Sequence, residues 1–488
     1  MGTNYGRGII NQIEDLTVQN DRLMRENKQL RAENRELRAQ LKAIESSMEA
    51  RIAAAVQKAL TPLIAELSAK DEKITKLASE VDRLKAQIGK NSGNSSKPPG
   101  QDGFKRIPNS REPSSRKSGG QTGHPGKRLE LPENLDELVE KGLARCELVD
   151  HTNGASLFAT RFTIDIDITV VVTEHRYLLG SIPLEHRTEV TYGSRIKALA
   201  ALLSTEGIIA EERLSDFFKE ITHGAIKLSD ATIEKFLFTL NEKLAPELSA
   251  IKTSLLNETV LHIDETPMRC TQKPDYRGEE CVLRKSEGTS FNVYIRTHSG
   301  ETATLYTVNP QKDDAGINRD GLLPQYIGII SQDHEAKFYH YGTAHATCGA
   351  HLLRELRGMF ELQKITWANE MRQFIADIND YKNKDMALGS TFSNLGVLAG
   401  FDRRYDELID KGHAAFRALK EKELGYDELR RMLKRLTQYK DCYLLFIRDY
   451  RAPFTNNLAE RDLRPCKTKQ KVSGCFRSWA GIERYARG

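Results

Sequence analysis

The sequence lacks the features that are typical of secreted and membrane proteins. Its seven cysteines are odd in number and scattered, so their spacing gives no disulfide framework. The chain does not open with a charged segment followed by a short apolar core, and no apolar run is long enough to cross a bilayer. These absences predict a cytoplasmic, reducing setting.

Strong net charge is also lacking, although the charge is unevenly distributed. The formal net charge is +5 over 488 residues. Residues 90–128 nevertheless contain nine Lys and Arg against two acidic residues, and residues 461–488 contain eight against two. Either stretch alone would be read as solvated surface. Two such stretches in a nearly balanced chain indicate a polyanionic partner.

Heptad repeats dominate residues 1–90. Position d holds Leu16, Leu23, Leu30, Leu37 and Ile44. Position a holds Asn20, Asn27 and Asn34 between apolar residues, and buried Asn at this position favours a two-stranded parallel coil. Pro62 interrupts the pattern, and a second heptad run follows it. We expect a coiled coil that makes the chain a homo-oligomer, most simply a dimer, rather than a helix packed on its own chain.

Three further regions precede the C-terminal half. Residues 91–128 are rich in Gly, Ser, Pro and basic residues, which predicts a flexible basic linker that contacts phosphates or acts only as a tether. Within residues 129–190, the alternation of Phe162–Val170 predicts a strand. Residues 191–256 predict short amphipathic helices with a turn at His223–Gly224 and a cap at Ser229, as in a helix-turn-helix DNA-binding unit or a plain helical bundle.

Residues 257–488 contain two aspartates that follow apolar, strand-like runs. Val260–Ile263 ends at Asp264, and Tyr326–Gln332 ends at Asp333. Ligand sites in open α/β sheets gather at the carboxyl ends of strands, so these carboxylates are candidates for one site. The segments predicted as further strands of a meander are Glu280–Arg284 and Asn292–Arg296.

A third carboxylate, Glu460, lies on a short predicted helix that follows a helical insertion at about 360–450. Thr455 or Asn456 is expected to cap this helix, and Pro465 is expected to end it near Arg464. The residues expected on one helical face are Asn457, Glu460 and Arg464.

Three carboxylates in one site repel one another unless a cation neutralises them. Their hard oxygens suit Mg²⁺ or Mn²⁺. Two such ions, roughly 4 Å apart, can activate a water or a 3′-hydroxyl and stabilise the leaving oxygen in an attack on a phosphodiester. Basic surroundings that hold a nucleic acid would complete such a site.

Several segments, which follow one another in a specific order along most of the chain, resemble the insertion-sequence-66 family of bacterial DDE transposases. They begin with the leucine-rich coil and continue with "NSGNSSKPPGQDG", "RKSGGQTGHPGKRLELP", "YGSRIKALAALL", "LSDATIEKFL", "VLHIDETPMR", "QDHEAKFYHYGTAHATCGAHLLREL" and "NNLAERDLRPCKTKQKVSGCFRS". The last three match the family's catalytic segments.

This resemblance implies a multidomain α+β protein with an RNase H-like core at 257–488, interrupted by the helical insertion. It implies that Asp264, Asp333 and Glu460 bind two Mg²⁺ or Mn²⁺ ions and catalyse strand cleavage and strand transfer at the ends of the chain's own insertion element. Double-stranded DNA, at element ends and target, is then the partner in the bacterial nucleoid, and companion proteins encoded by the same element are expected.

Supporting residues are expected around the three carboxylates. Cys348 and His351 match a Cys-x-x-His element of such transposases; they either support the site or anchor a helix, and Asn457 is a further candidate for support. By charge and nearness alone, the expected phosphate contacts are Arg464, Lys467, Lys469 and Lys471.

The chain departs from the family in the module at 129–190. Members often carry paired zinc-binding cysteines there, whereas only Cys146, with His151 nearby, remains. We therefore expect no zinc in this module. A catalytically silent, dimeric DNA-binding regulator is the alternative function, and a purely structural coiled-coil protein is a weaker one.

Overall fold

The computed structural model describes residues 4–95, 102, 131–151, 153–154, 156–157, 159–178, 180–186, 188–277, 280–421 and 423–488. The chain divides into two compact units, residues 1–88 and 89–488, which are described separately below. Among the described residues, every helix is too short or too polar to span a membrane.

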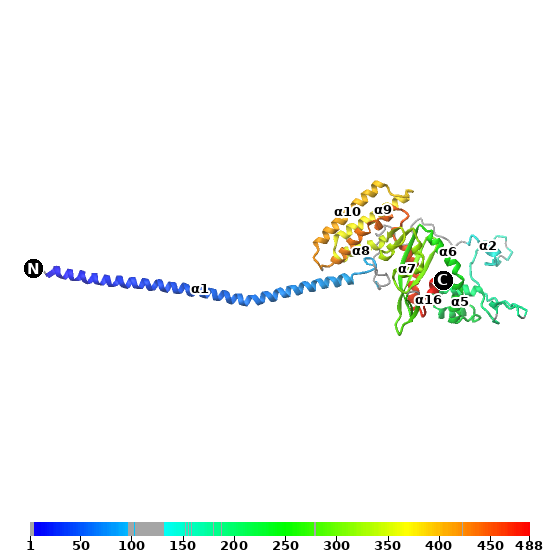
Figure 1. Cartoon of the computed structure of the whole chain (residues 1–488), viewed down its shortest axis with the longest axis horizontal. Helices are drawn as coiled ribbons and strands as arrows, with labels where there is room; N and C mark the ends of the chain where they lie inside the picture. The colour runs from blue at the N-terminus through cyan, green and yellow to red at the C-terminus, as the bar shows by residue number, and fades with distance from the viewer. Residues whose placement is uncertain are drawn as a thin grey trace. The chain divides into compact units, whose positions relative to one another are not determined.

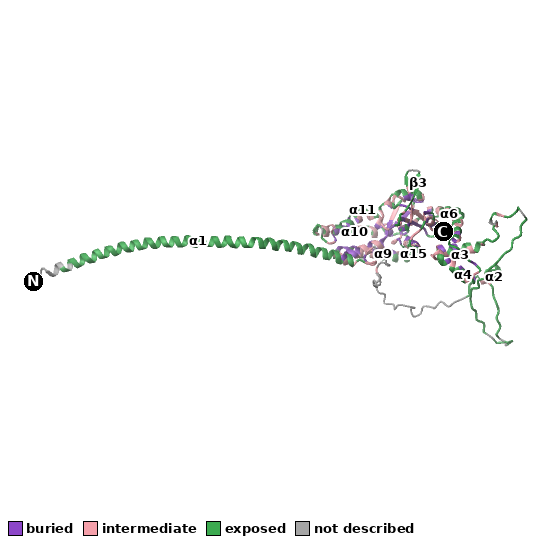
Figure 2. Cartoon of the chain, turned by 90° about the horizontal axis from the view of Figure 1, so that it is seen from below, coloured by how far each residue is buried: buried purple, intermediate pink, exposed green. Residues whose placement is uncertain are grey.

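The first unit is the single helix α1 (Asn4–Ile88). It runs through Pro62, so the proline that interrupts the heptad pattern does not end the helix. The leucines at position d are exposed along its length, for example Leu16 by 64% and Leu37 by 62% (Figure 2). An isolated helix with an apolar stripe has no core on which to bury it.

The first part of the second unit carries little regular structure among its described residues. Its helical elements there are α2 (Leu135–Glu140) and η2 (Leu184–His186). The strand predicted over Phe162–Val170 is absent: these residues are extended and exposed, because no neighbouring strand pairs with them among the described residues. Most of the predicted linker lies outside the described residues, but residues 91–95 form a turn in which the Asn94 side chain is buried.

Four helices follow: α3 (Ser194–Thr205), α4 (Glu211–Ile221), α5 (Asp230–Lys243) and α6 (Ala245–Leu256). Leu214, Phe218 and Ile233 form the centre of the core between α3, α4 and α5. The predicted cap is confirmed, since Ser229 Oγ accepts a hydrogen bond of 3.2 Å from the Thr232 amide. The predicted turn is also present, with both of its residues at positive φ.

A five-stranded mixed sheet forms the centre of the unit, in the order β5-β4-β1-β6-β7. The strands are β1 (Val260–Cys270), β4 (Phe291–Ser299), β5 (Thr304–Asn309), β6 (Ile329–Gln332) and β7 (Ala344–Thr347). Neighbours β1, β4 and β5 are antiparallel, whereas β6 and β7 run parallel to β1. The short elements between strands are α7 (Asp314–Asp320), η3 (Leu323–Gln325) and η4 (Ala336–His340).

The predicted strand ends need two corrections. Strand β1 does not end at Asp264 but continues to Cys270, because β4 pairs with it over its whole second half. The predicted strand at Glu280–Arg284 belongs instead to a separate hairpin of β2 (Gln272–Arg277) and β3 (Glu280–Lys285).

Helices cover both faces of the sheet. On one face, Leu261 and Ile263 of β1 pack with Leu255 of α6 and Ile317 of α7. On the other face, Met268 of β1 packs with residues of three C-terminal helices. These helices are α14 (Asn457–Asp462), α15 (Arg464–Ser473) and α16 (Trp479–Arg487).

The predicted helical insertion is present and has its own apolar core, which includes Trp367, Tyr405 and Leu429. Helix α8 (Gly349–Gln363) leads into it, and its own helices are α9 (Thr366–Ala387), α10 (Leu395–Ala418), α11 (Tyr426–Gln438), α12 (Lys440–Tyr443) and α13 (Leu445–Arg448). Figure 1 shows α9 and α10 side by side, outside the layers that cover the sheet.

Candidate functional site

The register of the two central parallel strands places Asp264 beside Asp333. The last paired residues of β1 and β6 are His262 and Ser331. Asp264 lies two residues further along β1, and Asp333 directly follows Gln332, the last residue of β6. Neighbouring strands are about 4.8 Å apart, so the two backbone positions are adjacent at the carboxyl end of β6. Alternation along β1 directs Asp264 to the face that the C-terminal helices cover, and Glu265 to the opposite face.

Helix α14 brings Glu460 to the same place, and Asn456 fixes the start of this helix. Asn456 is fully buried, and its Nδ2 donates a 2.8 Å hydrogen bond to the carbonyl of Ile263, next to Asp264. Its Oδ1 lies 3.1 Å from His262 Nδ1, and its amide donates to Cys348 Sγ at 3.3 Å. Asn456 occupies the predicted N-cap position, but its side chain binds β1 instead of capping α14.

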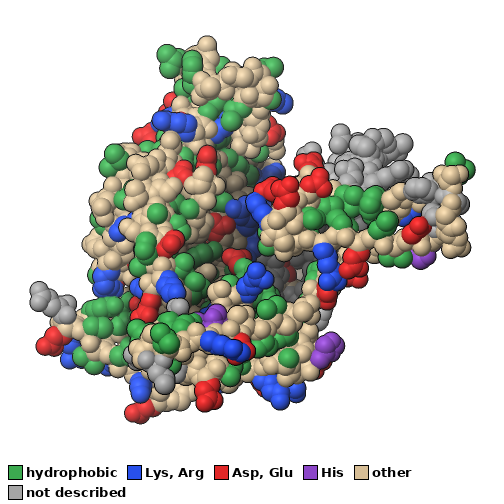
Figure 3. All heavy atoms as spheres, turned by 90° about the vertical axis from the view of Figure 1, so that its right-hand side faces the viewer, with side chains coloured by type: hydrophobic (Ala, Val, Ile, Leu, Met, Phe, Trp, Pro, Cys, Tyr) green, Lys and Arg blue, Asp and Glu red, His purple; other side chains and the backbone are tan. Residues whose placement is uncertain are grey.

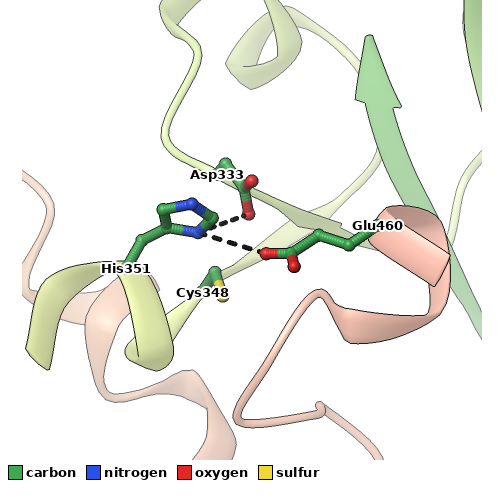
Figure 4. Close-up of side chains that lie close together, drawn as sticks. All are labelled: Asp333, Cys348, His351 and Glu460. Atoms are coloured by element: carbon green, nitrogen blue, oxygen red, sulfur yellow. Dashed lines mark ion pairs between the residues drawn. The ribbon is translucent and has the colours of Figure 1, made fainter. Parts of the chain in front are cut away.

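Helix α8 contributes the groups that contact these carboxylates. His351 Nδ1 lies 3.2 Å from Asp333 Oδ1 and 3.6 Å from Glu460 Oε1 (Figure 4). Arg354, one turn along α8, lies 3.6 Å from the same Glu460 oxygen. Single ligand atoms of Asp333, Cys348, His351 and Glu460 lie within 4.8 Å of one another.

A close approach holds the first turn of α8 in position. The Gly349 amide donates a 2.8 Å hydrogen bond to the carbonyl of Phe454, two residues before Asn456. A Cβ at Gly349 would lie 2.2 Å from the Phe454 ring, so only glycine fits there. The amide of Cys348 donates to the carbonyl of Gln332, which joins α8 to the residue before Asp333.

The site concentrates negative charge in a partly buried place. Burial, the charge of Asp333 and, less strongly, that of Glu460 raise the pKa of Asp264 to about 7, although Lys467 opposes this effect. Burial alone would lower the pKa of His351, but its contacts with Asp333 and Cys348 raise it to about 10. Without a metal ion, protonated His351 therefore offsets the carboxylates together with Arg354 and Lys467.

The residues present fit a divalent cation. Among the described residues, no hydrogen bond of good geometry reaches the buried atoms Asp333 Oδ1, His351 Nδ1 or Glu460 Oε1. Buried polar atoms without partners are rare and often mark an ion site. Two carboxylate oxygens that face each other, with a third carboxylate on the adjacent strand, are the donors that Mg²⁺ and Mn²⁺ prefer.

The group of Asp333, Cys348, His351 and Glu460 is also compatible with a second kind of metal ion. A thiol and an imidazole beside two carboxylates also provide enough ligands for zinc. Zinc bound by Cys348 and His351 would need two more ligands. The structure supplies carboxylates there, whereas His334 contacts Tyr339 instead, at 2.7 Å.

Three of the four predicted phosphate-contacting residues are exposed, whereas the fourth, Lys469, is buried. Arg464, Lys467 and Lys471 are exposed on α15. Lys469 is buried, and its Nζ donates to the carbonyl of Ser204 at 3.3 Å, which argues against the predicted phosphate contact. Asn457, the predicted supporting residue, is exposed on α14. The neighbouring residue, Asn456, makes the supporting contacts with Ile263 and Cys348.

The predicted shared face of Asn457, Glu460 and Arg464 is also incorrect. Helix α14 ends at Asp462, and Arg464 opens α15 with Pro465 in its first turn. Proline suits the first turn of a helix, so it starts α15 here as well as limiting α14.

Sequence reasoning missed a buried charge network beneath the site. Arg296 Nη2 donates a 2.7 Å hydrogen bond to Glu265, and Arg296 also pairs with Asp320 of α7. Lys337 contacts the second oxygen of Glu265 and lies 3.3 Å from Glu335. The network thus joins the residue after Asp264 to the segment after Asp333. The sequence signal for this network was the presence of Glu265 directly after Asp264, and of Glu335 and Lys337 shortly after Asp333.

Comparison with known protein families gives two matches. Residues 189–484 match the model described as Transposase IS66 family. Residues 9–130 match a family of unknown function, DUF6444. No curated protein and no solved structure matched the chain.

Proposed function

Because the chain belongs to the IS66 family of transposases, we propose that it is a DNA transposase that cleaves and joins strands at the ends of its own insertion element. The observation that carries the proposal is that Asp333 and Glu460 face each other, with Asp264 close enough for both charges to raise its pKa. Asp264 lies on β1, Asp333 directly follows the neighbouring strand β6, and Glu460 approaches Asp333 through α14. We assign these three residues as metal ligands.

The order and direction of the strands support an RNase H-like core within residues 257–488. Three antiparallel strands, β1, β4 and β5, are extended by two strands parallel to β1 on its other side. The proposed insertion, α9 to α13, enters between the strand that precedes Asp333 and the helix that carries Glu460. Residues 191–256 are the proposed helix-turn-helix-like DNA-binding region.

When bound, Mg²⁺ or Mn²⁺ ions activate a water or a DNA 3′-hydroxyl and stabilise the oxygen that leaves. Asp264, Asp333 and Glu460 would hold these ions. Arg354 of α8 lies beside Glu460, and Asn456 joins the start of α14 to the backbone of β1 next to Asp264. His351 contacts two of the carboxylates, so it orients them before ions bind.

The basic surroundings support a polyanionic substrate. On the face of the molecule in Figure 3, Lys and Arg side chains gather around a hollow near the centre of the view. Lys467 is close enough to Asp264 to lower the pKa of that carboxyl, so we assign it, with Arg464 and Lys471, to phosphate contacts. Pairing of two chains through α1 would hold two element ends together.

Magnesium-dependent nicking of a labelled duplex with the terminal sequence of the element tests the proposal. The wild-type chain should nick and join strands, and Asp333→Asn should abolish both while DNA binding is retained. Asp410→Asn, at an exposed carboxylate of α10, is the control and should behave as wild type. Persistent cleavage by Asp333→Asn would remove the assignment, and binding without any nicking by wild type would favour the silent regulator.

A further inference from the structure

A cavity of about 530 Å³ lies within residues 89–488, between the turn at residues 90–95, α8 and α11. Its wall includes His334, which directly follows Asp333, and Glu355, which is four residues along α8 from His351. At 1.5 Å per helical residue, Glu355 is about 6 Å along α8 from His351 and Met359 is about 12 Å from it. The cavity therefore begins about one turn of α8 from His351, which contacts two of the carboxylates.

One side of the cavity is apolar and aromatic. Met359, Leu362 and Met432 line it together with Tyr439. The Tyr439 ring stacks on Tyr339 with centroids 4.4 Å apart, so it is held at a fixed orientation. Thioether and aromatic groups of this kind provide a flat, polarisable surface for a planar ring.

Two polar atoms in the wall are buried and unpaired. Within the described part of the chain, Arg435 Nε and Gln363 Oε1 have no hydrogen-bond partner. The rest of the Arg435 guanidinium is held by Glu355, which fixes its direction. Both atoms are shielded from solvent, so neither faces the open space of the cavity, and the fixed guanidinium contributes its charge to the wall.

The charge of the lining favours a phosphate. Four basic side chains, Lys90, Arg431, Lys434 and Arg435, line the cavity against two acidic ones, Glu355 and Glu428. Both acidic residues already have Arg neighbours, since Glu355 pairs with Arg435 and Glu428 lies 3.9 Å from Arg431. Lys434 and Arg431 are exposed, so their charges face the solvent at the rim.

We propose that this cavity receives one nucleotide of the DNA strand next to the phosphodiester that the chain cleaves, with its base against Tyr439 and its phosphate at Arg431 and Lys434. The inference rests on the proposed function and specifies how its substrate is held. Enzymes that carry out chemistry on a base take that base out of the stack into a pocket, and the cavity would receive a base beside the reacting phosphodiester in the same way. A nucleotide in this cavity would fix the strand relative to Asp333 through His334.

Photo-cross-linking tests the proposal without requiring catalysis. Full-length Asp333→Asn protein is bound to a duplex of the element end in which 5-iodo-2′-deoxyuridine replaces single nucleotides on either side of the cleavage position. The cross-linked peptide is then identified by mass spectrometry. We expect one position to label the α11 peptide that contains Met432 and Tyr439.

Two changes to the cavity should reduce this label. Leu362→Trp fills the cavity and should lower the yield about tenfold. The exposed double variant Arg431→Gln/Lys434→Gln, which leaves the core unchanged, should lower it severalfold. Arg430→Gln is the matched control, because Arg430 is exposed on the same helix, pairs with Asp427 and does not line the cavity.

Several outcomes would overturn the proposal. Equal cross-link yields in Leu362→Trp and its parent would do so, as would labels confined to other peptides. Labelling of the α11 peptide by free 5-iodo-dUMP but by no duplex position would show a site for free nucleotides instead of a DNA strand. A cross-link that persists while wild-type protein shows no magnesium-dependent nicking would contradict the proposed function and leave the cavity assignment standing.

Discussion

Single polar residues with several partners determine the geometry of the site. Asn456 binds β1, His262 and Cys348 at once, although it carries no charge and is unremarkable in sequence. The helical-face pattern selected Asn457, because it assumed a helix that continues to Arg464. A buried amide that ties a helix to a strand leaves no periodic signal, so only the three-dimensional contacts identify it.

Substitution of Asn456 tests this role. Asn456→Ala removes both side-chain hydrogen bonds and leaves the buried carbonyl of Ile263 without its donor. The free energy of unfolding, measured by urea denaturation, should fall by about 1–3 kcal/mol. Asn457→Ala, at the exposed neighbouring position, should change it by no more than about 0.5 kcal/mol. Equal losses in the two variants would contradict the role given to Asn456.

At the scale of elements, the apolar strand runs predicted that Asp264 and Asp333 lie beside each other at the two central parallel strands, but not the length of β1. The sequence "DETP" is typical of a turn, and proline is disfavoured within central strands. Beyond His262, however, the pairing with β6 stops while that with β4 continues, so Pro267 lies where β1 is paired on one side only. The pairing with β4 sets the length of β1. Local sequence propensity does not encode such long-range pairing.

The network of Arg296 joins β1, β4 and α7, so its loss should affect the whole sheet. Arg296→Met leaves Glu265 and Asp320 buried with one partner fewer, and we expect a loss of about 3–5 kcal/mol in the free energy of unfolding. Arg404→Met breaks an exposed pair with Glu407 on α10 and should cost about 1 kcal/mol or less. Chemical denaturation of both variants checks the difference, and a similar loss in each would contradict the structural role of the network.

At the scale of the molecule, the sequence predicted the long N-terminal helix, the helical region and the helical insertion, because each has a strong hydrophobic period. It wrongly predicted a strand at residues 162–170, since alternation shows which face is apolar and not whether a partner strand exists. The sequence also did not predict that α14 and α8 meet at β1 and β6. The contacts of Asn456 with β1 and with Cys348 join residues more than a hundred positions apart, and the family resemblance alone suggested that α14 would reach the site.

Self-association through α1 is the prediction at this scale. Leu30→Lys with Leu37→Lys introduces charge at position d, and the full-length chain should change from a dimer to a monomer by light scattering or sedimentation. Ala32→Lys with Ala39→Lys adds the same charge on the opposite side of the same helical turns and should leave the dimer intact. A dimer that survives the first pair, or dissociates with the second, would count against the coiled coil.

The central claim is that Asp264, Asp333 and Glu460 bind divalent ions together. Titration of the full-length protein with Mn²⁺, followed by electron paramagnetic resonance, measures this directly. The account predicts about two bound ions per chain, a loss of that binding in Asp333→Asn and in Glu460→Gln, and unchanged binding in Asp410→Asn. Mn²⁺ binding that is equally strong in wild type and in both site variants would contradict it.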